Sequence, residues 1–255
     1  IIKKLVRDNQ LSYEHNQILV SSGAKQSLYN LFQALLNPGD EVIIPAPYWV
    51  SYPAMAELAG AQAIIVKGAA ENRLKITPAQ LENAITDKTR LLVLNSPSNP
   101  SGMAYSQEEL KSLAEVLERH PKVFVVSDDI YEHIYWGPGG FANLLTLCPQ
   151  FKDRFVVING VSKTYAMTGW RIGYAAGPAE VIKAMKKLQS QSTSNACSIS
   201  QAAACAALNG DQSCITEMLK AFRQRHDWLT DALNQIPGFN AMPADGTFYS
   251  FPCVQ

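Results

Sequence analysis

The sequence lacks the cysteine and histidine patterns that bind metals or form disulfide frameworks. Its 255 residues contain five cysteines and four histidines, with no C-x-x-C pair and no metal-ligand spacing. We therefore predict no metal site, and the odd number of cysteines favours free thiols in a cytoplasmic protein. Neither a G-x-G-x-x-G motif nor a Walker A motif occurs, so the sequence predicts no nucleotide site of those kinds.

The sequence also lacks an excess of either charge and any long apolar run. It contains 22 basic and 22 acidic residues, which gives a formal net charge of zero. This balance predicts no basic surface for nucleic acid, and no apolar run approaches the roughly 20 residues that span a bilayer. We therefore expect neither a nucleic-acid partner nor a membrane partner. The hydrophobic content of 47% is sufficient for a large buried core.

Short apolar strands alternate with helical segments through the first part of the chain. Apolar strands that alternate with helices are typical of a mostly parallel sheet covered on both faces. The sequence therefore predicts an α/β protein with a three-layer αβα large domain. We predict strands at 18–20, 41–45, 61–67, 90–95, 123–126, 155–158 and 172–176, and helices at 3–9, 24–36, 50–59, 81–85 and 108–119.

After about residue 181 the strand–helix alternation stops. Residues 183–208 and 214–233 predict two long helices, and residues 247–251 predict a strand. We therefore assign residues 1–182 to a large ligand-binding domain and residues 183–255 to an interdomain helix with the start of a smaller α+β domain. The chain begins without methionine and stops within an apolar stretch, so we expect it to be cut at both ends.

Four polar motifs directly follow predicted strands. They are Ser22-Gly23, the loop NSPSNPSG at 95–102, the segment SDDIYE at 127–132, and Gly160 to Lys163. In open α/β sheets, ligands bind beyond the carboxyl ends of the strands. The sequence therefore predicts one ligand site at this edge of the sheet. Taken singly, the loop at 95–102 could also be an ordinary turn, and the aspartate pair in 127–132 could cap a helix.

The strongest motif is SKTYAMTGWR at 162–171, in which Lys163 and Arg171 stand eight residues apart. A lysine must lose its proton to attack an aldehyde, and burial or a nearby cation lowers its pKa. An arginine offers a fixed and permanently charged fork to a phosphate. Taken alone, the pair could equally be a surface lysine and a salt-bridged arginine.

Together and in this order, the motifs resemble those of the class I/II (fold-type I) aminotransferases that depend on pyridoxal 5′-phosphate (PLP). The likeness is closest to prokaryotic-type aspartate and prephenate aminotransferases. It implies that Lys163 holds PLP as a Schiff base and that Arg171 binds the cofactor phosphate. It also implies that Asp128 pairs with the pyridine nitrogen, while Asn99 and Tyr131 contact the phenolic oxygen. The catalytic residues implied are Lys163, Asp128 and Tyr131.

The turn that enters the helix at 24–36 has a glycine at its start. Free N–H groups and the helix dipole favour an anion at such a turn. The resemblance implies that the backbone amides of Gly23, Ala24 and Lys25 hold the phosphate and that Trp49 stacks on the pyridine ring; the alternative for Trp49 is core packing. The position of Lys25 is similar to that of a lysine that recognises the distal carboxylate of acidic substrates, although a solvated lysine is the alternative. The substrate-binding residues implied are Lys25, Trp49 and Asn99.

The sequence departs from the family pattern at Gly160, where many relatives carry a phosphate-binding serine, so another group must supply that bond. The arginine that clamps the substrate α-carboxylate is expected beyond Gln255. The resemblance implies amino transfer between aspartate or glutamate and a 2-oxo acid, in a cytoplasmic homodimer. The alternatives are another PLP reaction on the same scaffold, such as β-elimination or decarboxylation, and a regulatory or non-catalytic domain.

Overall fold

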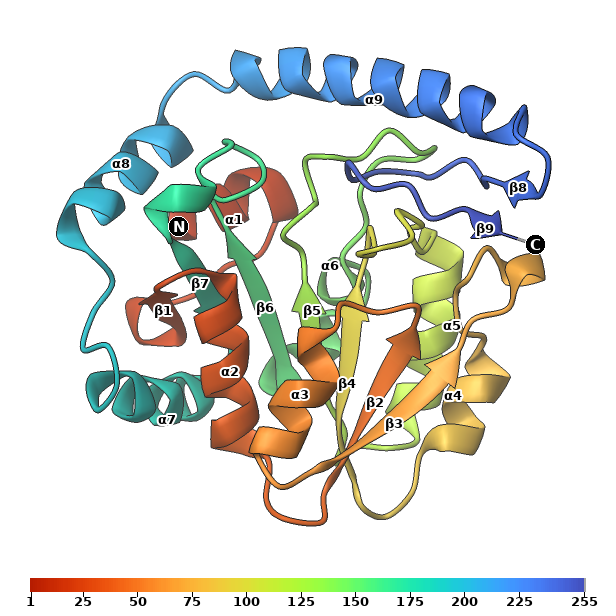
Figure 1. The fold of residues 1–255 in the computed structure, drawn as a ribbon. Coiled ribbons are helices and arrows are strands. Elements are labelled where there is room, and N and C mark those ends of the chain that lie inside the picture. The colour runs from red at the N-terminus through yellow and green to blue at the C-terminus, as the bar shows by residue number, and fades with distance from the viewer. Residues whose placement is uncertain (255) are drawn as a thin grey trace.

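The computed structural model describes residues 1–254 and is built around a seven-stranded sheet (Figure 1). The strand order is β1-β7-β6-β5-β4-β2-β3. Only β7 runs against its neighbours β1 and β6, whereas the other pairs are parallel, which confirms the predicted mostly parallel sheet. The strands are β1 (Ile18–Ser21), β2 (Glu41–Ala46), β3 (Gln62–Lys67), β4 (Thr89–Asn95), β5 (Phe124–Asp128), β6 (Phe155–Gly160) and β7 (Gly173–Ala176).

Helices cover both faces of this sheet, which confirms the three-layer αβα architecture (Figure 1). Along β4, Leu92 and Leu94 pack against the layer of α1, α4, α5 and α6, while Leu91 and Val93 pack against the layer of α2, α3 and α7. This alternation follows from the two-residue period of a strand. The helices are α1 (Ile2–Asn9), α2 (Ala24–Leu35), α3 (Ser51–Leu58), α4 (Pro78–Ala84), α5 (Gln107–Glu118), α6 (Leu144–Leu147), α7 (Ala179–Ser190), α8 (Ser198–Asn209) and α9 (Ser213–Asn234).

The prediction of one long helix over 183–208 is wrong, because this segment forms α7 and α8 with a break between them. The backbone N–H groups of Ser192, Thr193 and Ser194 all donate to the carbonyl oxygen of Gln189, at 3.0 to 3.1 Å. Ser194 then adopts a left-handed φ of 61°, which ends the helical path. The polar run STSN at 192–195 also has no apolar side chain with which to continue the buried stripe of α7.

The predicted strand at 247–251 is also wrong. Thr247 is fully buried and has a left-handed φ of 70°, which an extended strand cannot contain. Its N–H donates to the carbonyl oxygen of Ile134 at 2.7 Å, so this position is fixed by the loop after β5. The strand lies later in the chain, where β9 (Cys253–Val254) pairs antiparallel with β8 (Phe239–Asn240).

The helix α9 crosses above the carboxyl ends of the parallel strands, and the chain that follows α9 runs between it and the sheet (Figure 1). The large sheet ends at Ala176 in β7, and helices follow it up to Asn234. The domain division at residue 182 stays a prediction. Within residues 1–254, no helix is both long enough and apolar enough to cross a membrane.

Candidate active site

A cavity of about 280 Å³ lies beyond the carboxyl ends of the strands. The predicted site residues line it, apart from Gly23, which adjoins it through Ala24. Its walls come from the turn after β1, the loops after β2, β4 and β6, the end of β5 and the segment after α9. The lining residues are Ala24, Lys25, Leu28, Trp49, Tyr52, Asn95, Asn99, Asp128, Ile130, Tyr131, Ser162, Lys163, Thr168, Arg171 and Tyr249.

Asp128 ends β5 and is almost completely buried in the cavity wall. Its Oδ2 atom accepts a hydrogen bond from the Tyr52 hydroxyl at 2.8 Å, whereas Oδ1 has no hydrogen-bond partner among residues 1–254. Burial raises the pKa of this carboxyl to about 6, and the Tyr52 hydrogen bond and the charge of Lys163 oppose the rise. Asp128 therefore presents one free acceptor oxygen to whatever occupies the cavity.

The neighbouring Asp129 does not line the cavity. Its carboxylate accepts hydrogen bonds from the Ser127 hydroxyl, at 2.5 Å, and from the Asn143 side-chain amide. Burial raises the pKa of Asp129 to about 7. Of the aspartate pair in SDDIYE, Asp128 alone is placed to meet a ligand.

Lys163 lies in the loop after β6, half-buried against the cavity. Its Nζ atom is 5.3 Å from the ring centroid of Phe248. Burial lowers the pKa of this amine, the nearby positive charge of Arg171 lowers it further, and Asp128 opposes both effects. The site therefore favours the neutral, nucleophilic form of the lysine more than water does.

The turn after β1 and Arg171 form a cradle for an anion. Gly23 has a left-handed φ of 89°, and a Cβ atom at this position would lie 2.4 Å from Arg171 Nη2. Arg171 Nη1 donates to the carbonyl oxygen of Thr168 at 3.0 Å, which holds the guanidinium beside the turn. The first N–H groups of α2, at Ala24 and Lys25, have no intrahelical acceptor. The Arg171 guanidinium, the free backbone N–H groups and the positive end of the α2 dipole therefore all lie at this turn, where they would favour an anion.

A second glycine permits this convergence. A Cβ atom on Gly173 of β7 would lie 2.1 Å from the backbone nitrogen of Ala24. Gly173 also pairs with Ser21 of β1, directly before the turn. Only glycine at this position lets β7 pass so close to the start of α2.

Hydrogen bonds join the loop after β4 to the end of β5. The Asn95 side chain accepts from the Asn99 N–H at 2.7 Å and donates to the Asp128 carbonyl oxygen at 2.9 Å. The hydroxyls of Tyr131 and Tyr249 are 2.7 Å apart. Burial raises the pKa of Tyr131, so this phenol stays protonated. Asn99 and Tyr131 therefore both reach the cavity from fixed loops.

Trp49 and Lys25 form the outer part of the cavity wall. Lys25 is exposed, and its Nζ atom lies 4.8 Å from the centroid of the Trp49 ring, within reach of a cation–π interaction. Trp49 also meets Tyr52 edge to face, with ring centroids 5.4 Å apart. A solvent-exposed cation is therefore available in the cavity wall beside Trp49.

The structure adds cavity residues that the sequence did not predict, among them Tyr52, Asn95, Ser162 and Tyr249. Tyr52 stands three residues after Trp49, in helix α3, and one-turn spacing was the only available signal for it. Asn95 begins the loop in which only Asn99 was singled out. Tyr249 had no sequence signal, because the backbone of the segment after α9 determines its position.

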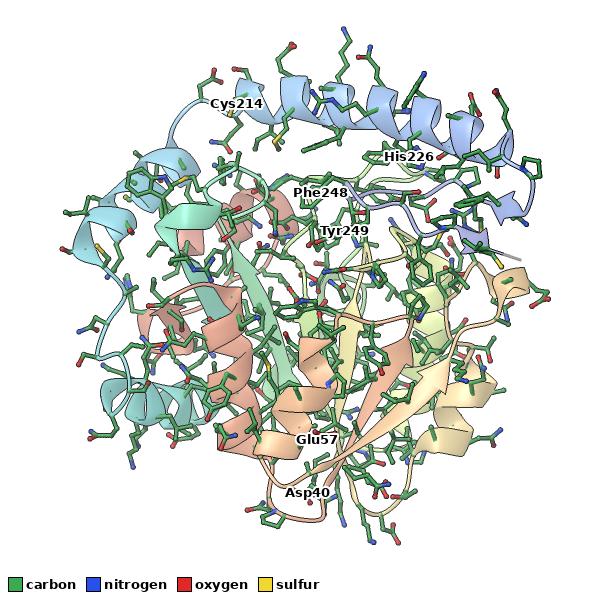
Figure 2. The ribbon with its side chains drawn as sticks, viewed as in Figure 1. Asp40, Glu57, Cys214, His226, Phe248 and Tyr249 are labelled. Carbon is green, nitrogen blue, oxygen red and sulfur yellow. The ribbon has the colours of Figure 1, made fainter. Side chains whose placement is uncertain are left out.

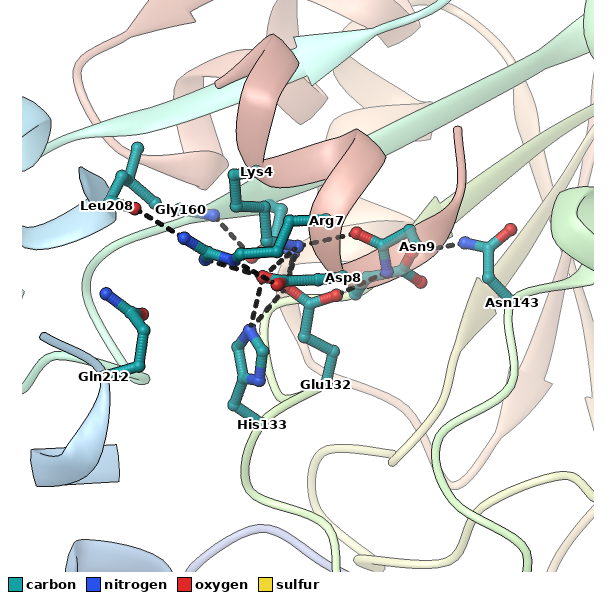
Figure 3. A network of polar contacts seen from close by, with 12 residues as sticks. Lys4, Arg7, Asp8, Asn9, Glu132, His133, Asn143, Gly160, Leu208 and Gln212 are labelled. Carbon is teal, nitrogen blue, oxygen red and sulfur yellow. Dashed lines mark hydrogen bonds and ion pairs between the residues drawn. The ribbon is translucent and has the colours of Figure 1, made fainter. Parts of the chain in front are cut away.

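A buried polar network supports the far side of the segment that carries Asp128 and Tyr131 (Figure 3). Glu132 accepts hydrogen bonds from the Lys4 ammonium, from Asn9 at 2.7 Å and from Asn159 at 2.7 Å. Asp8, Glu132 and His133 lie close enough together to suggest a metal site. The Lys4 ammonium bonds Glu132 and lies 3.8 Å from Asp8, so it already supplies the positive charge. We therefore interpret this cluster as a structural connection between α1 and the site.

Comparison with known proteins places this geometry in a family. Residues 1–254 match the family described as "Aminotransferase class I and II". The chain is 55% identical, over its full length, to the aspartate/prephenate aminotransferase of Nitrosomonas europaea. It is 53% identical, over 99% of its length, to the aspartate aminotransferase of Geobacillus stearothermophilus. In both cases it spans 64% of the relative's length.

Solved structures share the fold. The aspartate aminotransferase from Rhizobium meliloti superposes with a TM-score of 0.97 at 48% identity, over 98% of this chain and 63% of that one. The aspartate aminotransferase from Thermus thermophilus with maleate superposes with a TM-score of 0.92 at 41% identity, over 98% of this chain and 65% of that one. Sequence and structure comparisons therefore agree on the same group of proteins.

Proposed function

Because the chain belongs to the class I and II aminotransferase family, we propose that its protein transfers an amino group between an L-amino acid and a 2-oxo acid with PLP as cofactor. The observation that carries this proposal is the meeting of Lys163, Asp128 and Arg171 in one cavity. The names of its relatives support the same reaction. Since the chain spans 64% of their length, the activity is proposed for the whole protein.

The cavity fits PLP in its charge and in its donors. Asp128 Oδ1 is a buried acceptor without a partner among residues 1–254, as a protonated pyridine nitrogen requires. Arg171 and the N-terminus of α2 offer cationic and N–H donors to a phosphate. The Ser162 hydroxyl also lines this part of the cavity, so we propose that it replaces the hydroxyl missing at Gly160. Trp49 supplies an aromatic face for the ring.

When bound, the protonated cofactor ring withdraws the electrons released at the substrate Cα atom. In the proposed reaction, the neutral Nζ of Lys163 would take the proton from the substrate Cα and later release it to the cofactor carbon that had carried the lysine. Asp128 would hold the proton on the ring nitrogen through Oδ1. Asn99 and Tyr131 would donate to the ring oxygen. Because these groups lie on short loops at strand ends, the sheet fixes their relative positions.

We also propose that the substrate is acidic, namely aspartate or glutamate. The exposed cation of Lys25 at the mouth of the cavity is placed to pair with a distal carboxylate. A dicarboxylate, maleate, accompanies the related enzyme of Thermus thermophilus in its structure.

We propose a homodimer, as the family resemblance implies. A groove of about 480 Å³ runs between α2 and α3 and reaches both Lys25 and Arg171. Its walls include Tyr29 and Leu58, which are 41% and 69% exposed. A second copy that covered this groove would bury both side chains beside the cofactor cavity. Sedimentation analysis of Leu58→Glu should show dissociation to monomers, whereas a wild-type monomer would contradict the proposal.

The decisive test of the function is Lys163→Ala, with Lys183→Ala as the matched control on an exposed side chain. We expect the wild type to transfer the amino group of aspartate to 2-oxoglutarate without releasing ammonia or pyruvate. Lys163→Ala should lose at least about 100-fold in rate, since proton transfer by a positioned side chain contributes that much. Release of ammonia by the wild type would instead indicate elimination chemistry. A Lys163→Ala protein with full transfer activity would rule out the assigned role.

A further inference from the structure

The segment at 243–249, which we call the arm, is tied to the large sheet by its backbone. The carbonyl oxygen of Asp245 accepts from the N–H groups of Trp136 and Gly137, at 2.8 and 3.0 Å. The N–H groups of Asp245 and Gly246 both donate to the carbonyl oxygen of Gly102, at 3.0 and 3.1 Å. The arm is thus bonded at once to the loop that carries Asn99 and to the loop that carries Tyr131.

The side chain of Asp245 strengthens this attachment. One carboxylate oxygen accepts from Arg73 at 2.8 Å, and the other accepts from the Ala104 N–H at 2.9 Å. Thr247 follows in its left-handed conformation, fully buried, with its N–H on the Ile134 carbonyl oxygen. Tyr249, two residues later, lines the cavity, and Phe248 lies beside Lys163.

Those two side chains, Phe248 and Tyr249, lie between α9 and the sheet (Figure 2). The Phe248 ring is 5.3 Å from Lys163 Nζ, and it packs against Phe222 of α9 with ring centroids 5.5 Å apart. Tyr249 meets Tyr131 edge to face, with ring centroids 5.7 Å apart and hydroxyls 2.7 Å apart. The arm therefore contacts both Lys163 and Tyr131.

We propose that Tyr249 is a positioning residue that donates its hydroxyl hydrogen to Tyr131 and thereby directs the Tyr131 hydrogen to the ring oxygen of the cofactor. This inference rests on the proposed function. A phenol has one hydrogen to donate and can also accept, so Tyr131 can accept from Tyr249 while it donates to the ring. Hydrogen bonds in such a chain polarise one another, which makes Tyr131 the stronger donor.

The surroundings of Tyr131 keep its hydrogen in place. Burial raises the pKa of Tyr131, so the phenol stays protonated and can donate to the cavity. The titratable groups that face the two hydroxyls are Asp128 from β5, Tyr52 from α3 and Lys163 from the loop after β6. Replacing Tyr249 with phenylalanine retains all three of these groups and removes only the contribution of Tyr249 to the raised pKa of Tyr52.

The experiment measures the absorbance of bound PLP as a function of pH in Tyr249→Phe. In bound PLP, the ring oxygen and the nitrogen that links Lys163 to the cofactor would share one proton. A hydrogen bond donated to the ring oxygen would weaken its hold on that proton, so the proton would be lost at a lower pH. Loss of the Tyr249 hydroxyl should therefore raise the midpoint of this absorbance titration by about 0.5 pH unit. A shift of this size corresponds to part of the free energy of one hydrogen bond. We expect kcat to fall about threefold with KM little changed, because one cooperative bond is weakened.

Tyr135→Phe is the matched control, since Tyr135 lies in the loop after β5 and its hydroxyl donates only to Pro138, at 2.8 Å. It should leave the midpoint at the wild-type value. An unshifted midpoint in Tyr249→Phe, or an equal shift in Tyr135→Phe, would overturn the role of Tyr249 while the proposed function stands. A wild-type protein that shows no PLP absorbance would instead overturn the proposed function itself.

Discussion

Replacing Gly23 with alanine should weaken PLP binding, because the new methyl group takes the space of the Arg171 guanidinium. The added Cβ atom would lie 2.4 Å from Nη2 and 3.0 Å from Cζ of Arg171, so the arginine has to move. A charge-assisted hydrogen bond is worth about 1.5–3 kcal/mol, which corresponds to a factor of about 10 to 100 in affinity. We therefore expect the Kd for PLP to rise by about that factor.

The substitution also strains the backbone, and a second glycine separates this effect from the clash. Gly39 has the same φ of 89°, but nothing lies within 4 Å of its added Cβ atom. Gly39 adjoins Asp40, at the opposite end of the molecule from Phe248 and Tyr249 (Figure 2). A positive φ costs a residue with a Cβ atom about 1–3 kcal/mol, and Gly23, whose ψ of 159° lies outside the left-handed helical region, should lose at least as much stability as Gly39.

The assay is a titration of each cofactor-free protein with PLP, followed by absorbance, alongside urea unfolding. Gly23→Ala should lose both stability and affinity, whereas Gly39→Ala should lose stability alone. Equal PLP affinity in the two variants would refute the idea that the turn and Arg171 share one tightly packed anion site. Replacing Arg171 with lysine in Gly23→Ala should lower the PLP affinity little further, because both changes remove the same paired N–H donors of the guanidinium from the phosphate.

Three further outcomes follow from other residues. Asp128 has a pKa of about 6, raised above its ordinary value, so its ionisation makes the cofactor-free protein less stable as pH rises from about 4 to 6. Asp128→Asn should remove this loss of unfolding free energy, which amounts to up to about 3 kcal/mol at pH 7. Urea unfolding of both proteins at about pH 4 and at pH 7 measures the difference. Glu132→Gln removes the carboxylate bonded to the buried Lys4 ammonium and leaves Asp8, 3.8 Å away, as its counter-charge, so it should cost up to about 3 kcal/mol in unfolding free energy. Replacing Lys4 with methionine as well should recover part of this loss, and additive losses would contradict the pairing. Lys25→Ala should lower kcat/KM for aspartate at least about tenfold but leave that for an uncharged amino acid unchanged, and equal losses for both would count against an acidic substrate.

Much of the fold was predictable because its signals are local. Each strand of the large sheet is a short apolar run between turn residues, and the polar motifs follow these runs directly. The chain order of strands and motifs therefore predicts that Asn99, Asp128 and Lys163 lie at one edge of the sheet. In the folded chain, all three residues line the same cavity.

The parts that were not predicted depend on contacts between distant segments. Nothing near Thr247 in the sequence shows that its N–H meets Ile134, so its left-handed backbone was missed and a strand was expected instead. The position of Tyr249 follows from the same contact. The break after α7 had a local signal in its polar residues, but helical periodicity on both sides outweighed it.

The segment from Asp128 to His133 has consequences for any attempt to redesign this site. Asp128 and Tyr131 face the cavity, while Asp129 and Glu132 face the opposite way and bond Asn143, Lys4 and their neighbours. A library that varies this segment cannot treat the two sides as independent. Transplanting it into another scaffold should succeed only when α1 and its lysine are transplanted with it, so the smallest exchangeable unit of this site is discontinuous in sequence.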